Sequence, residues 1–72
     1  MTTTNNRIRV DRIKLIAEMA RQNITGIELA EKSGVSRSSI QAMRSGKSCN
    51  RNTVIHVVRA LGVPVSDIIE EE

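Results

Sequence analysis

Residues 25–44 read TGIELAEKSGVSRSSIQAMR and predict a short helix, a tight turn and a second short helix. Thr25 precedes Glu28 by three positions, which is the spacing of a capping box, so the first of these helices is expected to begin here and to end near Ser33. Gly34 can adopt the left-handed conformation that closes a helix. The stretch therefore predicts a helix-turn-helix.

The second helix of this motif has one apolar and one polar face. Ser36 is a good N-cap for it, and it is expected to cover residues 37–45. Ala30 is small where the two helices have to cross closely. Three apolar side chains would hold the second helix against the core: Val35, Ile40 and Met43. The outward face would carry Arg37, Ser38, Gln41, Ala42 and Arg44. Arginine can bridge guanine O6 and N7, and glutamine can bridge adenine N6 and N7, so this face fits the major groove of DNA.

Before the motif, the spacing predicts one further helix. Asp11 is a candidate N-cap for a helix that ends near Gln22, with Val10 and Leu15 as a hydrophobic staple across the cap. Its buried stripe is expected to contain Leu15, Ile16, Met19 and Ala20. Residues 1–9 are expected to form a flexible arm, in which Arg7 and Arg9 either reach toward a partner or are solvated; solvation is the interpretation favoured.

After the motif, two more helices are expected and no strand. The first has its N-cap at Asn50 or Asn52 and is ended by Gly62 and Pro64. Its apolar residues follow the i, i+3, i+4, i+7 rule, as Val54, Val57, Val58 and Leu61. A short fifth helix would contain Val65, Ile68 and Ile69. The fold class expected is all-α, a compact bundle of about five short helices in a single domain at residues 10–70, followed by an acidic tail at 71–72.

The composition argues against several kinds of protein. The 72 residues include no Phe, Tyr or Trp, so the chain offers no ring on which the bases of a single strand could stack. One cysteine, Cys49, and one histidine, His56, are too few for a zinc site, and neither a metal nor a cofactor is expected. The sequence shows neither a pair of acids nor a histidine beside a nucleophile, so an enzyme is not expected. The longest aliphatic cluster, residues 54–58, is far too short to cross a bilayer, and no signal peptide is expected, so the protein is expected in the cytoplasm.

The charge is distributed unevenly along the chain. Residues 1–66 hold 11 basic and four acidic side chains, whereas the last six residues hold four acids. Between Ser36 and Asn52 there is no acid, and the four cations there are Arg37, Arg44, Lys47 and Arg51. A stretch of one sign usually marks a polyanionic partner, although a solvated basic face would look the same.

With these residues the chain resembles the phage-repressor and Cro type of helix-turn-helix protein, also called the xenobiotic-response-element type. The resemblance rests on residues 28–40, ELAEKSGVSRSSI, and continues through Gly46-Lys47 and Thr53-Val54 to residues 59–63, RALGV. It covers about residues 11–69 and implies a lambda-repressor-like fold. It also implies double-stranded DNA as the partner, with base contacts from Arg37, Ser38, Gln41 and Ala42. The phosphate contacts that it implies come from Thr25, Ser39, Lys47, Ser48 and Arg51.

The chain departs from the family pattern at three positions. Gly26 stands where many members have a glutamine that contacts DNA. Many members also pair an arginine of the first helix with a glutamate at the end of the third, and this chain has Met19 and Arg44 there, which leaves Arg44 to meet a phosphate. Arg51 stands where a subgroup has proline, and it adds charge to the loop.

One recognition helix reads only a few base pairs, so the resemblance implies a homodimer on a near-palindromic operator, acting as a repressor of transcription. Ile68 and Ile69 are the candidate dimer contacts; the alternative is that both close the core. Two further functions stay open. The chain could be the antitoxin of a toxin-antitoxin pair with the same fold, or a helical protein-interaction module that does not bind DNA.

Overall fold

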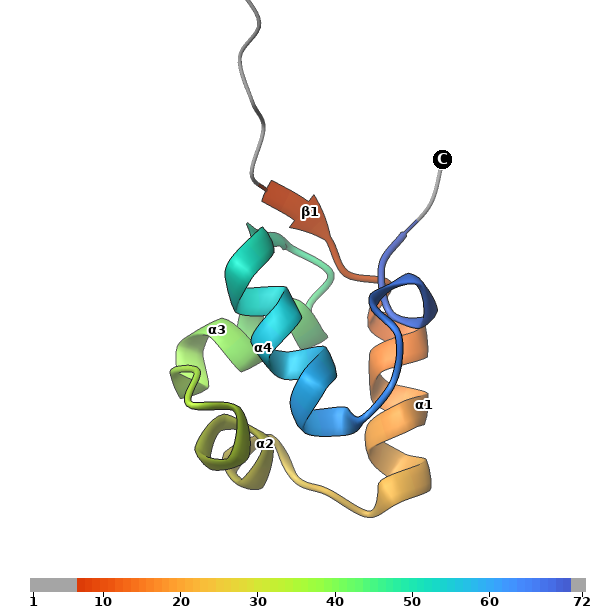
Figure 1. Cartoon of the computed structure of the whole chain (residues 1–72), viewed down its shortest axis with the longest axis vertical. Helices are drawn as coiled ribbons and strands as arrows, with labels where there is room; N and C mark the ends of the chain where they lie inside the picture. Colours follow the sequence, from red (N-terminus) through yellow and green to blue (C-terminus); the bar gives the residue numbers. More distant parts are fainter. Residues whose placement is uncertain (1–6, 71–72) are drawn as a thin grey trace, which may run out of the picture.

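The computed structural model describes residues 7–70 and shows a small helical bundle capped by a sheet (Figure 1). Within that range lie four α-helices, two strands and a 3-10 turn. In chain order they are β1 (Arg7–Arg9), α1 (Arg12–Gln22), α2 (Gly26–Ser33), α3 (Arg37–Arg44), β2 (Ser48–Asn50), α4 (Arg51–Leu61) and η1 (Val65–Asp67). The expected acidic tail at 71–72, and residues 1–6 of the expected arm, lie outside the described residues.

The helices begin where the capping residues predict. The Asp11 carboxylate accepts hydrogen bonds from the backbone N–H groups of Ile13 at 3.0 Å and Lys14 at 3.2 Å. Thr25 and Glu28 form both bonds of the capping box, at 3.1 and 2.9 Å. The remaining two caps are Ser36, which accepts from the N–H of Ser39, and Asn50, which accepts from the N–H of Asn52. Each side-chain oxygen satisfies a backbone donor that has no partner inside its own helix, which is why these boundaries are local properties of the sequence.

The core lies where α4 packs across the other helices. The four aliphatic residues predicted for its inner face are all buried: Val54, Val57, Val58 and Leu61. They meet Leu15 and Met19 from α1, Leu29 and Ala30 from α2, and Ile40 and Met43 from α3. The stripe predicted for α1 was partly wrong, because Ile16 is 40% exposed and Ala20 is also exposed. Only one side of α1 meets the bundle, so residues one position beyond Leu15 and Met19 turn toward solvent.

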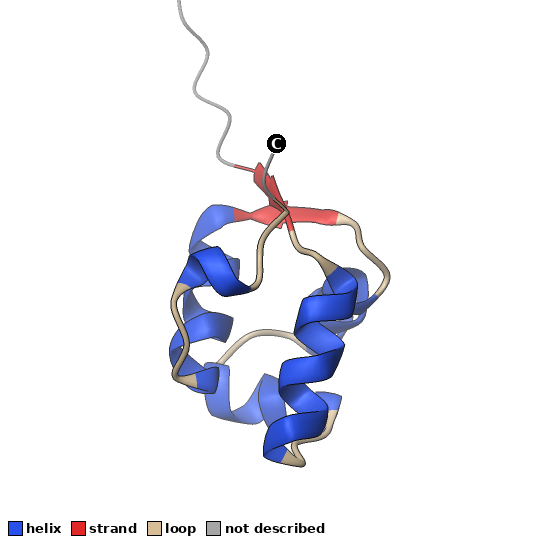
Figure 2. Cartoon of the chain, turned by 90° about the vertical axis from the view of Figure 1, so that its right-hand side faces the viewer, coloured by secondary structure: helices blue, strands red, loops and turns tan. Residues whose placement is uncertain are grey.

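Two strands replace part of the expected arm and loop, so the expectation of no strand was wrong. β1 and β2 pair antiparallel, with Arg7 opposite Asn50, Ile8 opposite Cys49 and Arg9 opposite Ser48. Figure 2 shows this sheet across one end of the helices. Ile8 packs against the core, while the two arginines beside it are exposed. Side chains alternate along a strand, so a half-buried isoleucine that faces the core places both neighbouring arginines on the other face.

The C-terminal segment is a 3-10 turn rather than the expected fifth helix. After η1 the chain runs beside β1, where Val10 and Ile69 form an antiparallel bridge. The backbone carbonyl of Ile68 accepts a hydrogen bond from the N–H of Asp11 at 2.8 Å, and the N–H of Glu70 donates one to the carbonyl of Arg9 at 2.9 Å. These backbone groups bond to the N-terminal strand and are therefore not available to continue a helix.

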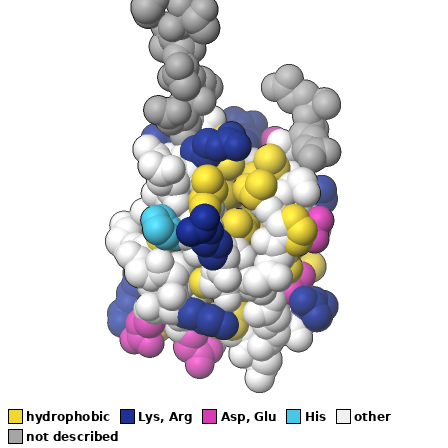
Figure 3. Space-filling model, in the orientation of Figure 1, with side chains coloured by type: hydrophobic (Ala, Val, Ile, Leu, Met, Phe, Trp, Pro, Cys, Tyr) yellow, Lys and Arg dark blue, Asp and Glu magenta, His cyan; other side chains and the backbone are white. Residues whose placement is uncertain are grey.

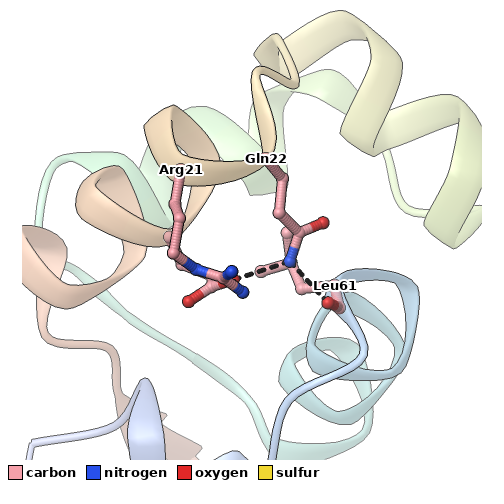
Figure 4. Close-up of polar contacts among 4 residues, drawn as sticks. Arg21, Gln22 and Leu61 are labelled. Carbon is pink, nitrogen blue, oxygen red and sulfur yellow. Dashed lines mark hydrogen bonds and ion pairs between the residues drawn. The ribbon is translucent and has the colours of Figure 1, made fainter.

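The far ends of α1 and α4 are joined by a side chain. The Gln22 amide donates to the backbone carbonyl of Leu61 at 2.6 Å and to the Glu18 carboxylate at 2.7 Å (Figure 4). Glu18 also forms an ion pair with Arg21. Accepting these bonds, from Arg21 most and then from Gln22, lowers the pKa of Glu18 below its ordinary 4.5. The contact fixes the end of the bundle opposite to the sheet.

Candidate nucleic-acid interface

The turn between α2 and α3 has the geometry of a helix-turn-helix. Gly34 ends α2 in the left-handed conformation, with φ of 74°, and its N–H donates to the carbonyl of Ala30 at 3.0 Å. The N–H of Val35 donates to the same carbonyl at 3.2 Å, so the chain leaves α2 sharply. Ser36 then caps α3. This connection sets α3 at an angle to α2 (Figure 1), and α3 is called the recognition helix below.

The recognition helix is held by its inner face and exposed on its outer face. Ile40 is 2% exposed and Met43 is fully buried, as predicted. The structure places Arg37, Ser38 and Gln41 together on the exposed side, where residues three and four apart are neighbours. Ala42 is half-buried against the core, so it lies at the edge of this face. The outer face therefore combines a guanidinium, a hydroxyl and an amide on a rigid helix.

Serine hydroxyls surround the start of the recognition helix. The Ser36 hydroxyl lies 3.2 Å from the Ser38 hydroxyl and 3.0 Å from that of Ser39. The positive end of a helix dipole lies at this point. Ser38 and Ser39 thus present hydroxyl groups where anionic oxygens are electrostatically favoured.

An open groove of about 300 Å³ separates the start of α2 from the recognition helix. Thr25 and Gly26 lie on one side of it, and Arg37 and Arg44 on the other. A Cβ atom built on Gly26 would lie 3.0 Å from Nη1 of Arg44, so the guanidinium occupies the space that a side chain at position 26 would take. Among the described residues no acidic group lies within 4.0 Å of Arg44. The missing side chain at position 26 and the basic residue at position 44 are therefore spatially linked, which the sequence did not reveal.

The loop after the recognition helix carries the other predicted phosphate ligands. Gly46 turns the chain with φ of 81°, and the N–H of Lys47 bonds to the carbonyl of Ala42 at 3.0 Å. Lys47 is exposed, Ser48 is half-buried in β2, and Arg51 is exposed in the first turn of α4. Lys47 and Ser48 lie on the segment that joins the recognition helix to α4, and Arg51 is the first residue of α4.

One basic residue near this loop was not predicted to belong to it. Arg7 in β1 donates from Nη2 to the carbonyl of Ser48 at 2.7 Å and from Nε to the Ser48 hydroxyl at 3.2 Å. The alternation Arg7-Ile8-Arg9-Val10 has the period of a strand and could have indicated this pairing.

Ile68, Ile69, Cys49 and His56 are the remaining residues that the sequence analysis named. Ile68 is 1% exposed and closes the core, while Ile69 is half-buried beside it. Cys49 is buried, and burial raises the pKa of its thiol while the nearby Arg7 lowers it less. His56 is exposed. Within residues 7–70 no three His, Cys, Asp or Glu side chains gather closely enough to hold a metal, and no helix there has the length and apolar character to span a membrane.

Comparison with known proteins agrees with this geometry. The crystal structure of the transcriptional regulator VanUg, Form II, has the same fold, with a TM-score of 0.74 and 23% identical residues over 97% of this chain and 92% of that chain. The search of curated proteins gives no match. The family model for the Cro/C1-type HTH DNA-binding domain matches residues 14–72, so the chain belongs to the Cro/C1-type helix-turn-helix family.

Proposed function

We propose that this protein is a sequence-specific regulator of transcription that places α3 in the major groove of double-stranded DNA. The observation that carries the proposal is the outer face of α3, where Arg37, Ser38 and Gln41 are exposed on a helix fixed from behind by Ile40 and Met43. A fixed helix presents donors at defined positions, which reading a base sequence requires. Family membership supports the same conclusion. Ala42, at the edge of this face, would contact a thymine methyl group.

Phosphate contacts flank the recognition helix on both sides in this proposal. Thr25 and Arg44 line the groove before it, Ser39 lies in its first turn, and Lys47, Ser48 and Arg51 follow it. No acid occurs between Ser36 and Asn52, so the DNA backbone meets one sign of charge along this segment. Phosphate contacts then supply most of the affinity, and base contacts set the register.

The regulator acts in the cytoplasm as a homodimer on a near-palindromic operator, and blocks transcription there. One recognition helix covers too few base pairs for useful specificity, and two copies related by a two-fold axis double the sequence read. An apolar area supports dimerisation: Figure 3 shows hydrophobic side chains gathered between α4 and the C-terminal segment. Ile69 is the accessible member of the isoleucine pair at this segment, because Ile68 lies in the core.

Selection of bound sequences from random duplex DNA tests the proposal. An enriched palindrome, or near-palindrome, with half-sites about one helical turn apart is expected. On the selected duplex, Arg37→Ala should weaken binding by about 1–3 kcal/mol and relax the preference at one base pair. Lys47→Ala should weaken all duplexes alike. An unchanged preference in Arg37→Ala would show that α3 does not read bases through this residue.

Light scattering on the selected duplex tests the dimer. Two protein chains per duplex are expected, and both should remain in the complex, with weaker binding, when one half-site is scrambled. A complex of one chain with an intact palindrome would contradict the homodimer.

A further inference from the structure

The β-sheet brings a fixed arginine beside the recognition helix. Arg7 donates two hydrogen bonds to Ser48, a residue 41 positions away in the chain. β1 is held by the register with β2 and by Ile8, which packs against the core. The guanidinium is therefore already ordered before any ligand arrives, which lowers the entropic cost of binding through it.

This arginine lines an open groove of about 270 Å³ between α3, β2 and the first turn of α4, called here the polar groove. The other polar side chains that line it are Ser38, Ser39, Ser48, Asn50 and Thr53. They offer four hydroxyls and an amide, and no acidic side chain is among the lining residues. One guanidinium surrounded by hydroxyl donors suits a phosphate group, whose oxygens accept several bonds at once.

The position of the polar groove indicates which molecule would supply such a phosphate. Ser38 belongs to the exposed face of α3 and also lines the groove, so the groove begins where the base-reading face ends. A duplex docked on that face brings its sugar-phosphate backbone alongside the helix. The groove therefore lies on the expected path of one strand.

We propose that the polar groove binds one backbone phosphate of the DNA, with Arg7 as the charged ligand. The proposal rests on the DNA-binding function given above and adds a contact from β1, which precedes residues 14–72, the part matched by the family model. Ile8 acts as a positioning residue, because its packing on the core holds Arg7 at Ser48. Affinity then depends on a strand that the helix-turn-helix motif does not include.

The test compares Arg7→Gln with Arg59→Gln on the selected duplex. Both substitutions remove one exposed positive charge, but Arg59 lies on the last turn of α4, at the end away from Asn50 and the groove. The dissociation constant is measured from 50 to 200 mM salt. Each phosphate contact contributes about 0.9 to the slope of log K against log salt. Raising the salt from about 50 to 200 mM should therefore reduce the affinity of Arg7→Gln by a factor about threefold smaller than the factor for the wild type. Arg59→Gln should keep the wild-type slope, and Arg7→Lys should keep it too, because it retains the charge.

Neutral phosphates locate the contact independently. Replacing single phosphates by methylphosphonates should reveal one position that weakens the wild type and Arg59→Gln much more than it weakens Arg7→Gln. A wild-type slope for Arg7→Gln, or equal losses at every phosphate in all three proteins, would overturn the proposal. If the wild type shows no salt-dependent binding to any duplex, the proposed DNA-binding function itself fails. That result differs from a failure of the Arg7 contact, in which the wild type still binds DNA.

Discussion

Substituting Gly26 should stabilise the fold and weaken DNA binding at the same time. Gly26 is the first residue of α2, and a Cβ atom there would lie 3.0 Å from Nη1 of Arg44 and 3.7 Å from Cγ2 of Ile40. The first contact is with the far end of a flexible side chain, so the chain accommodates a new side chain by moving the guanidinium. Gly26→Leu extends further into the 300 Å³ groove and displaces Arg44 more than Gly26→Ala does.

The two effects have different sizes and separate measurements. Leucine loses less backbone entropy on folding than glycine does. Gly26→Leu should therefore raise the free energy of unfolding by about 0.5 kcal/mol and the melting temperature by roughly 2–4 °C. Displacing Arg44 removes a charge-assisted contact worth about 1.5–3 kcal/mol, which is a loss of affinity of tenfold or more. Circular dichroism melts follow the first effect, and titration of a labelled selected duplex follows the second.

A double-mutant cycle isolates the role of Arg44. Arg44→Ala alone should lose as much affinity as Gly26→Leu, and adding Gly26→Leu to Arg44→Ala should change the affinity no further. If Gly26→Leu bound DNA as tightly as the wild type, or if the two losses added, the guanidinium over Gly26 would not contact DNA.

Two other predictions concern the end of the bundle opposite to the sheet. Gln22→Met removes the donor to the Leu61 carbonyl and should cost about 1 kcal/mol, visible in a urea titration; an unchanged midpoint would show that the bond does not join α1 to α4. Glu18→Gln should reduce the acid sensitivity of folding. The pKa of Glu18 is lowered in the folded state, so its contribution to stability is present above about pH 4.5 and is lost as the pH falls through the folded pKa. Melts from pH 6 to 3 should decline less steeply for Glu18→Gln, and identical slopes would contradict this role.

Local signals in the sequence were enough for the helices and for the motif. Asp11, Thr25 and Ser36 cap neighbouring backbone N–H groups, and Gly34 ends α2 by adopting the left-handed conformation. Each boundary therefore depends on a few adjacent residues. The apolar spacing of α4 likewise identifies its buried face without knowledge of its partners. For the same reason, the face of α3 that carries Arg37 and Gln41 could be predicted before the fold was known.

Contacts between distant segments depended on tertiary structure. Residues 7–10 alternate with the period of a strand, but so short a run does not identify its partner, and β1 forms only because β2 lies 41 residues later at the same end of the bundle. The exposure of Ile16, the return of Ile69 to Val10, and the guanidinium of Arg44 over Gly26 depend in the same way on how helices pack. Local hydrogen bonds decide where a helix begins and ends, whereas the packing of whole elements decides which charged side chains share a groove.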